Sequence, residues 1–307
     1  MTDLTTLRDF LRYALSQFGQ HPITLGHGTD SLWDEALALV FGAVNLPPNG
    51  DDRLLDARLT GPERARLLQL IRQRVEEHVP VPYLVGRAWY AGLPFVVDRR
   101  VLIPRSPIFE LLAEELAPWF VPPADRPVRL LDLCTGSGCL GITACLAFPE
   151  STGVLSDLES GACEVARQNI ALHGLNERLE VMQSDGFDGL FDETFDVIIC
   201  NPPYVDAEDM ASLPMEYRHE PDVALASGED GLDLVRRLVS QAADWLSESG
   251  VMILEVGNSW GRLDAIVAEH LGESLQWVEF AHGGHGVCVL SKRELDALYL
   301  VFSEGLS

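Results

Sequence analysis

Apolar strand-like runs alternate with helical segments through the second half of the chain, and this alternation constrains the fold most strongly. Connections that contain a helix are long enough to join parallel strands, so the pattern predicts a mostly parallel sheet covered by helices on both faces. Only His282-Gly-Gly-His285 separates the last two runs, which predicts an antiparallel hairpin. The expected strands are 128–133, 153–157, 178–183, 195–200, 250–256, 275–281 and 286–291.

The first 79 residues are predicted to form a helical domain. Thr60-Gly-Pro-Glu63 is a capping box with a proline just inside the helix start, and apolar residues follow it at helical spacing. Amphipathic helices are also expected over 5–18 and 30–42, with a loop over 45–52. Because this part carries no chemical motif, we interpret it as a domain that binds a partner. The alternative is a lid that only covers core surface.

Residues 80–104 have a different pattern, in which prolines and glycines interrupt alternating aromatic and β-branched residues. This predicts a β-hairpin connector that turns near Ala91-Gly92-Leu93. A helix is expected over 106–120. The chain is therefore divided into a helical domain (1–79), a connector (80–104) and an α/β domain (105–307).

The composition excludes several classes of protein. No apolar run is long enough to span a membrane, and the N-terminus lacks a signal-peptide pattern. The six cysteines form no CxxC pair and no Cys/His ligand spacing, so neither a metal site nor a disulfide framework is predicted. We expect a cytoplasmic protein with reduced thiols.

The net charge of −25 bears on the choice of partner. Nucleic-acid affinity depends on neutralising phosphates, so this surface should repel naked DNA or RNA. It should attract a basic protein. Solubility alone is the alternative explanation of the charge.

Gly136-Ser-Gly138-Cys-Leu-Gly141 is a GxGxxG sequence between a predicted strand and a predicted helix. Asp157 follows at the end of the next strand, where an acid binds ribose hydroxyls, so an NAD-dependent dehydrogenase is one interpretation. Asp132 lies just before the glycines, near the helix N-terminus where a pyrophosphate would bind. A carboxylate there opposes a phosphate and suits a cation, which favours S-adenosylmethionine. The alternative is that Asp132 caps its own loop.

Gly257-Asn-Ser259-Trp-Gly261 is a GxSxG sequence after a predicted strand, as in the nucleophile elbow of hydrolases. A hydrolase would also need an acid and a histidine, for which Asp264, His282 and His285 are available. Asp264 follows Ser259 too closely to be a good acid. We therefore favour a strand-to-helix turn with Ser259 near the helix cap.

The predicted strand 195–200 ends in Asn201-Pro-Pro-Tyr204. Both prolines lack an N–H but keep their carbonyls, and the first of them holds Asn201 extended. The result is a stiff group of hydrogen-bond acceptors at the carboxyl end of a strand, where open α/β sheets bind ligands. Asp157, Asp185 and the glycine loop fall at other strand ends, so all should line one crevice.

Several motifs together resemble a known family. The motifs LLDLCTGSG, SDLES, QSDGF and NPPYV occur in order, after the connector YLVGRAWYAGLPFVVDRRVLIPRSP. The chain resembles, over nearly its whole length, the class I S-adenosylmethionine-dependent methyltransferases of the protein-glutamine N5 family. The segments 103–111, 205–221 and 227–238 most resemble the branch that acts on large-subunit ribosomal protein three, not the release-factor branch. Gly186 departs from the family, which often has a larger residue near the adenine, and a looser adenine pocket is expected.

The resemblance implies a Rossmann-like, seven-stranded sheet with a C-terminal antiparallel hairpin, plus a small N-terminal helical domain. It implies methyl transfer to the side-chain amide nitrogen of a glutamine in a basic ribosomal protein, without a metal or a general base. The Asn201 side chain and the Pro202 carbonyl would receive the glutamine amide, and Tyr204 would stack on it. The implied substrate contacts are Asn201, Pro202, Pro203 and Tyr204. The implied cofactor contacts are Asp132, Cys134, Thr135, Gly136, Ser137, Gly138, Asp157, Asp185, Gly186 and Asn201.

Four alternatives stay open at this point. A release-factor glutamine methyltransferase and an adenine-N6 methyltransferase of nucleic acid would use the same chemistry. The negative charge and the connector sequence argue against the second of these. An NAD-dependent dehydrogenase and an inactive binding module belong to other classes. The intact glycine loop and Asn201 argue against an inactive module.

Overall fold

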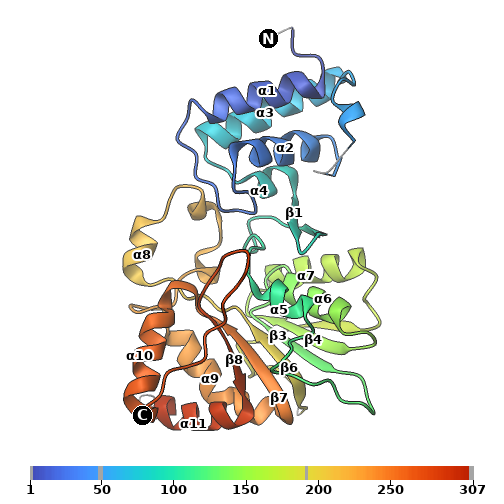
Figure 1. Ribbon diagram of the computed structural model, residues 1–307. Helices are drawn as coiled ribbons and strands as arrows, with labels where there is room; N and C mark the ends of the chain where they lie inside the picture. The colour runs from blue at the N-terminus through green and yellow to red at the C-terminus, as the bar shows by residue number, and fades with distance from the viewer. Residues whose placement is uncertain (1–2, 48–50, 191–192, 304–307) are drawn as a thin grey trace. The chain divides into compact units, whose positions relative to one another are not determined.

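The computed structural model describes residues 3–47, 51–190 and 193–303, which divide into two compact units (Figure 1). Unit 1 contains the chain up to Arg99 together with Ile103–Arg105 and Leu213–Glu220. Unit 2 contains Arg100–Leu102, Ser106–Ser212 and the chain from Pro221 onward. No helix in the described ranges is both long enough and apolar enough to cross a bilayer.

Helices build most of unit 1, and their starts follow the sequence signals. Thr6 and Thr60 each form a complete capping box, with Asp9 and Glu63 respectively, so both helix starts satisfy their free N–H groups. The helices expected over 5–18 and 30–42 and the start at Thr60 are confirmed. Residues 48–50 of the expected loop lie outside the described ranges. The elements are α1 (Leu7–Phe18), α2 (Leu32–Ala43), η1 (Asp52–Leu54), α3 (Gly61–Glu76), α4 (Val81–Val85), β1 (Arg87–Tyr90) and β2 (Leu93–Val96).

The hairpin β1–β2 turns where the sequence predicts it. Tyr90 pairs with Leu93, and the two residues between them are left-handed, with φ of 50° at Ala91 and 76° at Gly92. A two-residue turn with both φ values positive matches the twist of antiparallel strands. The expected hairpin and its turn are therefore confirmed.

A buried arginine ties the late segment Leu213–Glu220 into unit 1. The Arg74 side chain is 1% exposed, and its Nε donates to Glu35 Oε1 at 2.6 Å. Its Nη1 donates to Glu216 Oε1 at 3.0 Å, and its Nη2 donates to the Thr24 carbonyl at 2.7 Å. Because the charges are buried together, each carboxylate depends on the arginine to offset its lost hydration.

A second buried carboxylate anchors the end of the same segment. Both Glu220 oxygens accept hydrogen bonds from Arg105, at 2.6 and 2.8 Å, and Oε1 also accepts from the Ile103 backbone N–H. The His27 Nε2 lies 3.7 Å from Glu220 Oε2. The segment Leu213–Glu220 is thus held in unit 1 at two buried ionic contacts.

Unit 2 is built on a six-stranded sheet in the order β5-β4-β3-β6-β7-β8, in which only β8 is antiparallel. Helices α5, α6 and α7 cover one face and helices α9 and α11 cover the other (Figure 1). The strands are β3 (Arg129–Leu133), β4 (Thr152–Asp157), β5 (Leu179–Gln183), β6 (Phe195–Cys200), β7 (Leu246–Glu255) and β8 (Val287–Ser291). The helices are α5 (Ile108–Ala113), α6 (Cys139–Ala147), α7 (Ser160–Leu172), α8 (Ala207–Ser212), α9 (Asp233–Trp245), α10 (Trp260–Leu271) and α11 (Lys292–Ser303), with short η3 (Asp222–Ala224) and η4 (Gly257–Ser259).

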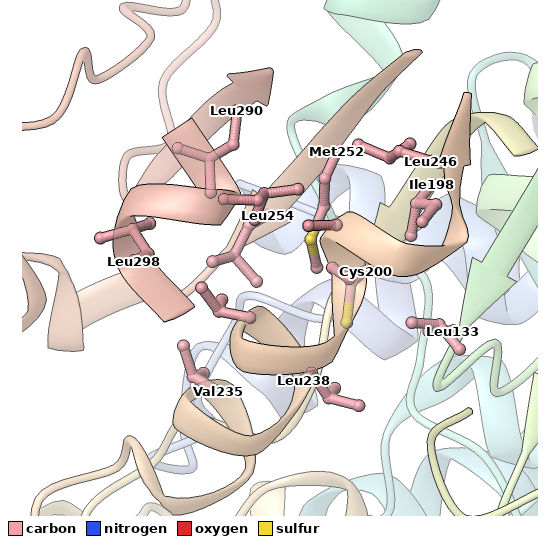
Figure 2. Close-up of a cluster of buried hydrophobic side chains, with 14 of the residues drawn as sticks. Leu133, Ile198, Cys200, Val235, Leu238, Leu246, Met252, Leu254, Leu290 and Leu298 are labelled. Carbon is pink, nitrogen blue, oxygen red and sulfur yellow. The ribbon is translucent and has the colours of Figure 1, made fainter. Parts of the chain in front are cut away.

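The main core of unit 2 lies between the sheet and helices α9 and α11. Figure 2 shows strand side chains such as Ile198 and Met252 packed against Val235 and Leu238 of α9 and against Leu298 of α11. Successive strand residues face opposite sides of a sheet, so a strand covered on both faces is apolar throughout. All six residues of β6 are buried, and all are apolar except Asp196, which pairs with Arg126. The strand ends directly at the tetrapeptide.

The predicted strand 275–281 is not formed, so the sheet has six strands where seven were expected, and the C-terminal hairpin is reduced to a short antiparallel contact with β8. This segment forms an isolated antiparallel bridge between Trp277 and Cys288, and the Val278 N–H donates to the Val287 carbonyl at 2.8 Å. The Leu275 N–H and the Trp277 Nε1–H instead donate to Asp264 Oδ1, at 2.9 and 3.1 Å. Left-handed glycines in the following loop also interrupt an extended pairing, and β8 pairs antiparallel with β7.

The helix expected over 106–120 is shorter than predicted. The helix α5 ends at Ala113, and Glu115 and Leu116 have positive φ values of 50° and 62°. Pro118 disfavours the helical conformation at Ala117, so a continuous helix could not reach residue 120.

Candidate functional site

A pocket in unit 2 opens at the carboxyl ends of β3, β4, β5 and β6. Parallel strands place these ends at one edge of the sheet, which is where α/β folds bind ligands. The structure brings many of the expected residues into its lining. These are Cys134, Gly136, Asp157, Asp185, Gly186, Asn201 and Pro203. Six other expected residues lie outside this lining. They belong to the end of β3 and the glycine loop (Asp132, Thr135, Ser137 and Gly138) and to the tetrapeptide (Pro202 and Tyr204).

The glycine loop between β3 and α6 is formed by left-handed residues. Gly136 and Gly138 have φ values of 55° and 81°, and a Cβ at Gly138 would lie 3.1 Å from Leu155. Cys134 also has a positive φ of 56°, which is strained for a residue with a side chain. The Thr135 N–H donates to the Ser156 carbonyl, and so fixes the loop against β4.

Asp132 is buried beneath this loop, with 1% of its surface exposed. Its Oδ2 accepts hydrogen bonds from the Thr135 hydroxyl and from the Gly141 N–H, the latter at 2.8 Å. Among the described atoms, its Oδ1 is buried without a hydrogen-bond partner. Burial raises the pKa of Asp132 to about 7, although the two donors oppose this rise. Asp132 therefore caps its own loop and still has one oxygen available to a donor.

Asp157 ends β4 and lines the pocket. Its Oδ2 accepts from the Gly136 N–H at 2.8 Å, and its Oδ1 accepts from the Glu159 N–H at 2.9 Å. Burial raises the pKa of the carboxyl, and these two backbone donors oppose the rise. The backbone thus fixes the direction in which Asp157 faces the pocket.

Asp185 and Gly186 follow β5 in a turn that borders the pocket. Asp185 pairs with Arg237, whose hydrogen bond lowers the pKa of that carboxyl. Gly186 has a φ of 60°, and a Cβ there would lie 2.8 Å from the Leu238 side chain. Leu238 therefore occupies the space that a larger side chain at position 186 would need. This packing is a reason for the glycine, which from the sequence we had linked to a looser adenine pocket.

The tetrapeptide follows β6 without an intervening residue. Asn201 and Pro203 line the pocket, Pro202 is buried and Tyr204 is half-buried. The Tyr204 carbonyl accepts a hydrogen bond from the Ser259 hydroxyl at 2.8 Å, and the Tyr204 hydroxyl lies 3.5 Å from Glu255 Oε1 as a donor. Sequence reasoning missed Glu255, and it saw Ser259 only as part of the GxSxG motif.

The GxSxG motif does not form a hydrolase site. Ser259 is the N-cap residue of α10, as expected, but its hydroxyl makes no cap hydrogen bond and donates to Tyr204 instead. The side chain of Asp264 accepts from the loop before β8, and His285 pairs with Asn258. The three groups needed for a catalytic triad are thus engaged with other partners.

Comparison with known proteins first identifies the class. The sequence model of the Methyltransferase small domain family matches residues 110–216. The solved catalytic domain of hMettl16, in complex with a MAT2A 3′UTR hairpin, is similar in fold with a TM-score of 0.51 at 15% identity, over 92% of this chain and 91% of that one. The fold is that of a class I S-adenosylmethionine-dependent methyltransferase.

Two curated relatives then identify the family. A ribosomal protein uL3 glutamine methyltransferase of Bordetella pertussis is 47% identical over 96% of this chain and 97% of the relative. One of Francisella tularensis is 40% identical over 96% of this chain and 93% of the relative. The chain belongs to the ribosomal protein uL3 glutamine methyltransferase family. The resemblance stated from the motifs is confirmed, including its branch.

Proposed function

We propose that the protein transfers a methyl group from S-adenosylmethionine to the side-chain amide nitrogen of a glutamine in ribosomal protein uL3. One observation carries the site assignment. Asn201 and Pro203 line the same pocket as the glycine loop and Asp157. A donor of methyl groups and an acceptor amide can therefore meet at the end of β6. The two relatives named for this activity support the choice of substrate.

The residues present fit S-adenosylmethionine. Asp157 offers a fixed carboxylate for ribose hydroxyls, and the left-handed loop at Gly136 leaves its backbone open to a close ligand. The unpartnered Asp132 Oδ1 is a buried acceptor beneath the loop, as a cationic cosubstrate would require. The sulfonium of this cosubstrate would supply an electrophilic methyl group.

Asn201 and Pro202 would position the nucleophile. The nitrogen of a glutamine amide is a poor nucleophile because its lone pair is delocalised into the carbonyl, so orientation has to supply much of the rate. We assign the Asn201 side-chain oxygen and the Pro202 carbonyl as acceptors for the two N–H bonds. These acceptors would aim the lone pair and stabilise the positive charge that develops on nitrogen. The two prolines offer no N–H that could bind the amide in the reverse orientation. We assign Tyr204 to stacking on the glutamine side chain.

The surface charge fits a basic protein substrate. The net charge is −25, and Glu208 and Asp209 are exposed on α8, shortly after the tetrapeptide. Ribosomal proteins are basic because they bind RNA, so uL3 is attracted where naked nucleic acid is repelled. A substrate of this kind places the enzyme in the cytoplasm, where ribosomes are made.

Unit 1 is assigned to recognition of the protein substrate. It contains an apolar groove formed by residues of α2, α4 and β1, among them Leu37, Val81 and Trp89. The Trp89 side chain is 39% exposed, so a large apolar surface faces the groove. An exposed aromatic side chain in a groove is a common anchor for a protein partner.

Methylation of purified uL3 tests the proposal. The full-length protein is incubated with labelled S-adenosylmethionine and unmethylated uL3, and the modified residue is located by mass spectrometry. The label should appear on one glutamine side chain, and Asn201→Ala should remove it while cofactor binding persists. Parallel incubations contain a release factor and adenine-containing RNA. Label on either of these, with none on uL3, would contradict the proposal.

A further inference from the structure

The acceptor tetrapeptide has few backbone donors with which to anchor itself. Pro202 and Pro203 have no N–H, so hydrogen bonds from later residues and from other elements are important for holding this turn. The next residue, Val205, donates to the Leu225 carbonyl at 2.8 Å and accepts from the Ser227 N–H. Within the tetrapeptide, Tyr204 also anchors the turn.

Glu255, which ends β7, and Ser259, in the turn that follows it, contact the hydroxyl and the carbonyl of Tyr204. The Ser259 hydroxyl donates to its carbonyl at 2.8 Å, and the Tyr204 hydroxyl is within hydrogen-bond distance of Glu255 Oε1. Glu255 and Ser259 are buried, with 5% and 4% of their surfaces exposed. Because β7 pairs with β6 in parallel, the carboxyl ends of both strands lie side by side.

Glu255 is itself fixed by a second hydroxyl. The Ser106 hydroxyl donates to Glu255 Oε2, and the same oxygen of Ser106 accepts from the Ile108 N–H at the start of α5. Ser106 is 4% exposed. A buried carboxylate with defined donors keeps one orientation, so its Oε1 is a fixed acceptor for the Tyr204 hydroxyl.

The backbone of two glycines packs closely against Tyr204. A Cβ at Gly257 would lie 2.4 Å from the Tyr204 ring, and Gly257 has a positive φ of 43°. A Cβ at Gly231 would lie 2.3 Å from the Tyr204 carbonyl oxygen. Both glycines thus permit a close approach that a side chain would prevent. The GxSxG motif supplies a surface and a donor for Tyr204 through Gly257 and Ser259.

We propose that Glu255 and Ser259 are positioning residues for methyl transfer, which act through Tyr204. Ser259 fixes the carbonyl and Glu255 fixes the hydroxyl, so the Tyr204 ring and the backbone of Asn201–Pro203 keep the orientation that the amide needs. This inference rests on the proposed function of the tetrapeptide. An error of about 1 Å in such a site costs up to 10²-fold in rate, so the anchoring contacts should affect kcat.

The first test compares two serine variants. Ser259→Ala removes the hydrogen bond to Tyr204, and the matched control Ser240→Ala removes a 2.8 Å bond of the same kind to the Arg237 carbonyl in α9. Ser259→Ala should lower kcat about tenfold, the usual effect of one lost hydrogen bond, with the uL3 KM and the cofactor Kd unchanged. Ser240→Ala should keep the wild-type kcat. Equal kcat values for the two variants would overturn the role of Ser259.

The second test is a double-variant cycle. Tyr204→Phe and Glu255→Gln should each lower kcat about five- to tenfold. If Glu255 acts through the Tyr204 hydroxyl, the double variant should lose no more than the larger single effect. Multiplied effects would show that Glu255 acts by another route and would overturn its assignment.

A third measurement separates this inference from the proposed function. The Asn201 side-chain amide signal in an NMR spectrum should be sharp in the wild type, broadened in Ser259→Ala and unchanged in Ser240→Ala. This readout reports the order of the tetrapeptide and needs no methyl acceptor. A wild type that leaves uL3 unmodified but shows these spectra would refute the proposed substrate alone. An unchanged Asn201 signal in Ser259→Ala would refute the positioning role.

Discussion

Glu220→Gln should destabilise unit 1 in a way that depends on pH. The Glu220 side chain has no exposed surface, and it accepts two hydrogen bonds from Arg105. Burial alone would raise the pKa of Glu220, but the nearby His27 and the charge and hydrogen bonds of Arg105 outweigh it and hold the pKa at about 2. The substitution keeps the shape of the side chain and removes its charge.

The size of the effect follows from the pKa. A fall from the ordinary 4.5 to about 2 corresponds to about 3 kcal/mol of unfolding free energy near neutral pH. Because the folded-state pKa of this carboxyl is the lower one, its contribution is complete above about pH 4.5 and is lost as the pH falls toward 2. About 1 kcal/mol should remain at about pH 3. Removing one partner of a buried pair typically costs about 3–5 kcal/mol, which agrees with the neutral value.

Urea unfolding read by pulsed hydrogen exchange measures this effect in unit 1 alone. Peptides from α1 and α3 report unit 1, and peptides from β3 and β6 report unit 2. Asp56→Asn is the matched control, because it removes a carboxylate from an exposed ion pair with Arg8 in the same unit. The control should change the stability of unit 1 little at either pH.

Two results would refute the reasoning. One is a Glu220→Gln protein whose unit 1 is as stable as the wild type at neutral pH. The other is a stability difference that stays constant as the pH is lowered from about 7 to about 3. In the second case the loss would come from shape or packing and not from the charge.

Three further predictions concern the site and its substrate. Asp157→Ala should weaken S-adenosylmethionine binding by roughly 1–3 kcal/mol in calorimetry, and tight NAD binding by the wild type would contradict the cofactor assignment. Asn201→Ala should lower turnover about 10²–10³-fold with cofactor binding intact, by analogy with the loss of one preorganised polar contact. Across a salt series, the specificity constant for uL3 should fall, since screening beyond about 8 Å weakens long-range attraction. Replacing Glu208 and Asp209 by their amides should flatten that response, and a flat response in the wild type would contradict steering by charge.

The parallel sheet could be predicted because each strand has a local signal. Strands such as β6 are apolar except for single residues such as Asp196 and are followed by turn residues, which identifies a strand buried on both faces. The segment 275–281 has a similar apolar pattern but forms only a short antiparallel contact with β8. The Leu275 N–H and the Trp277 Nε1–H donate to Asp264, a contact that no local pattern reveals.

The candidate site shows the same division between local and distant information. The glycine loop and the tetrapeptide are short motifs whose geometry follows from glycine and proline, so their residues could be named from the sequence. Glu255 and Ser259 become relevant only because β7 lies beside β6 and brings them to Tyr204. The GxSxG sequence by itself indicated a turn, but it could not indicate that this turn contacts Tyr204.

Buried polar contacts explain why the segment around Ile103–Pro107 helped to identify the family from the sequence. The adjacent residues Arg105 and Ser106 have different buried partners, Glu220 in unit 1 and Glu255 in unit 2. A buried charge or hydroxyl needs one particular partner, whereas an apolar core position tolerates several side chains of similar volume. Short polar sequences that supply such partners are therefore more specific than the apolar runs around them. The segment 205–221, which supplies Glu220, is informative for the same physical reason.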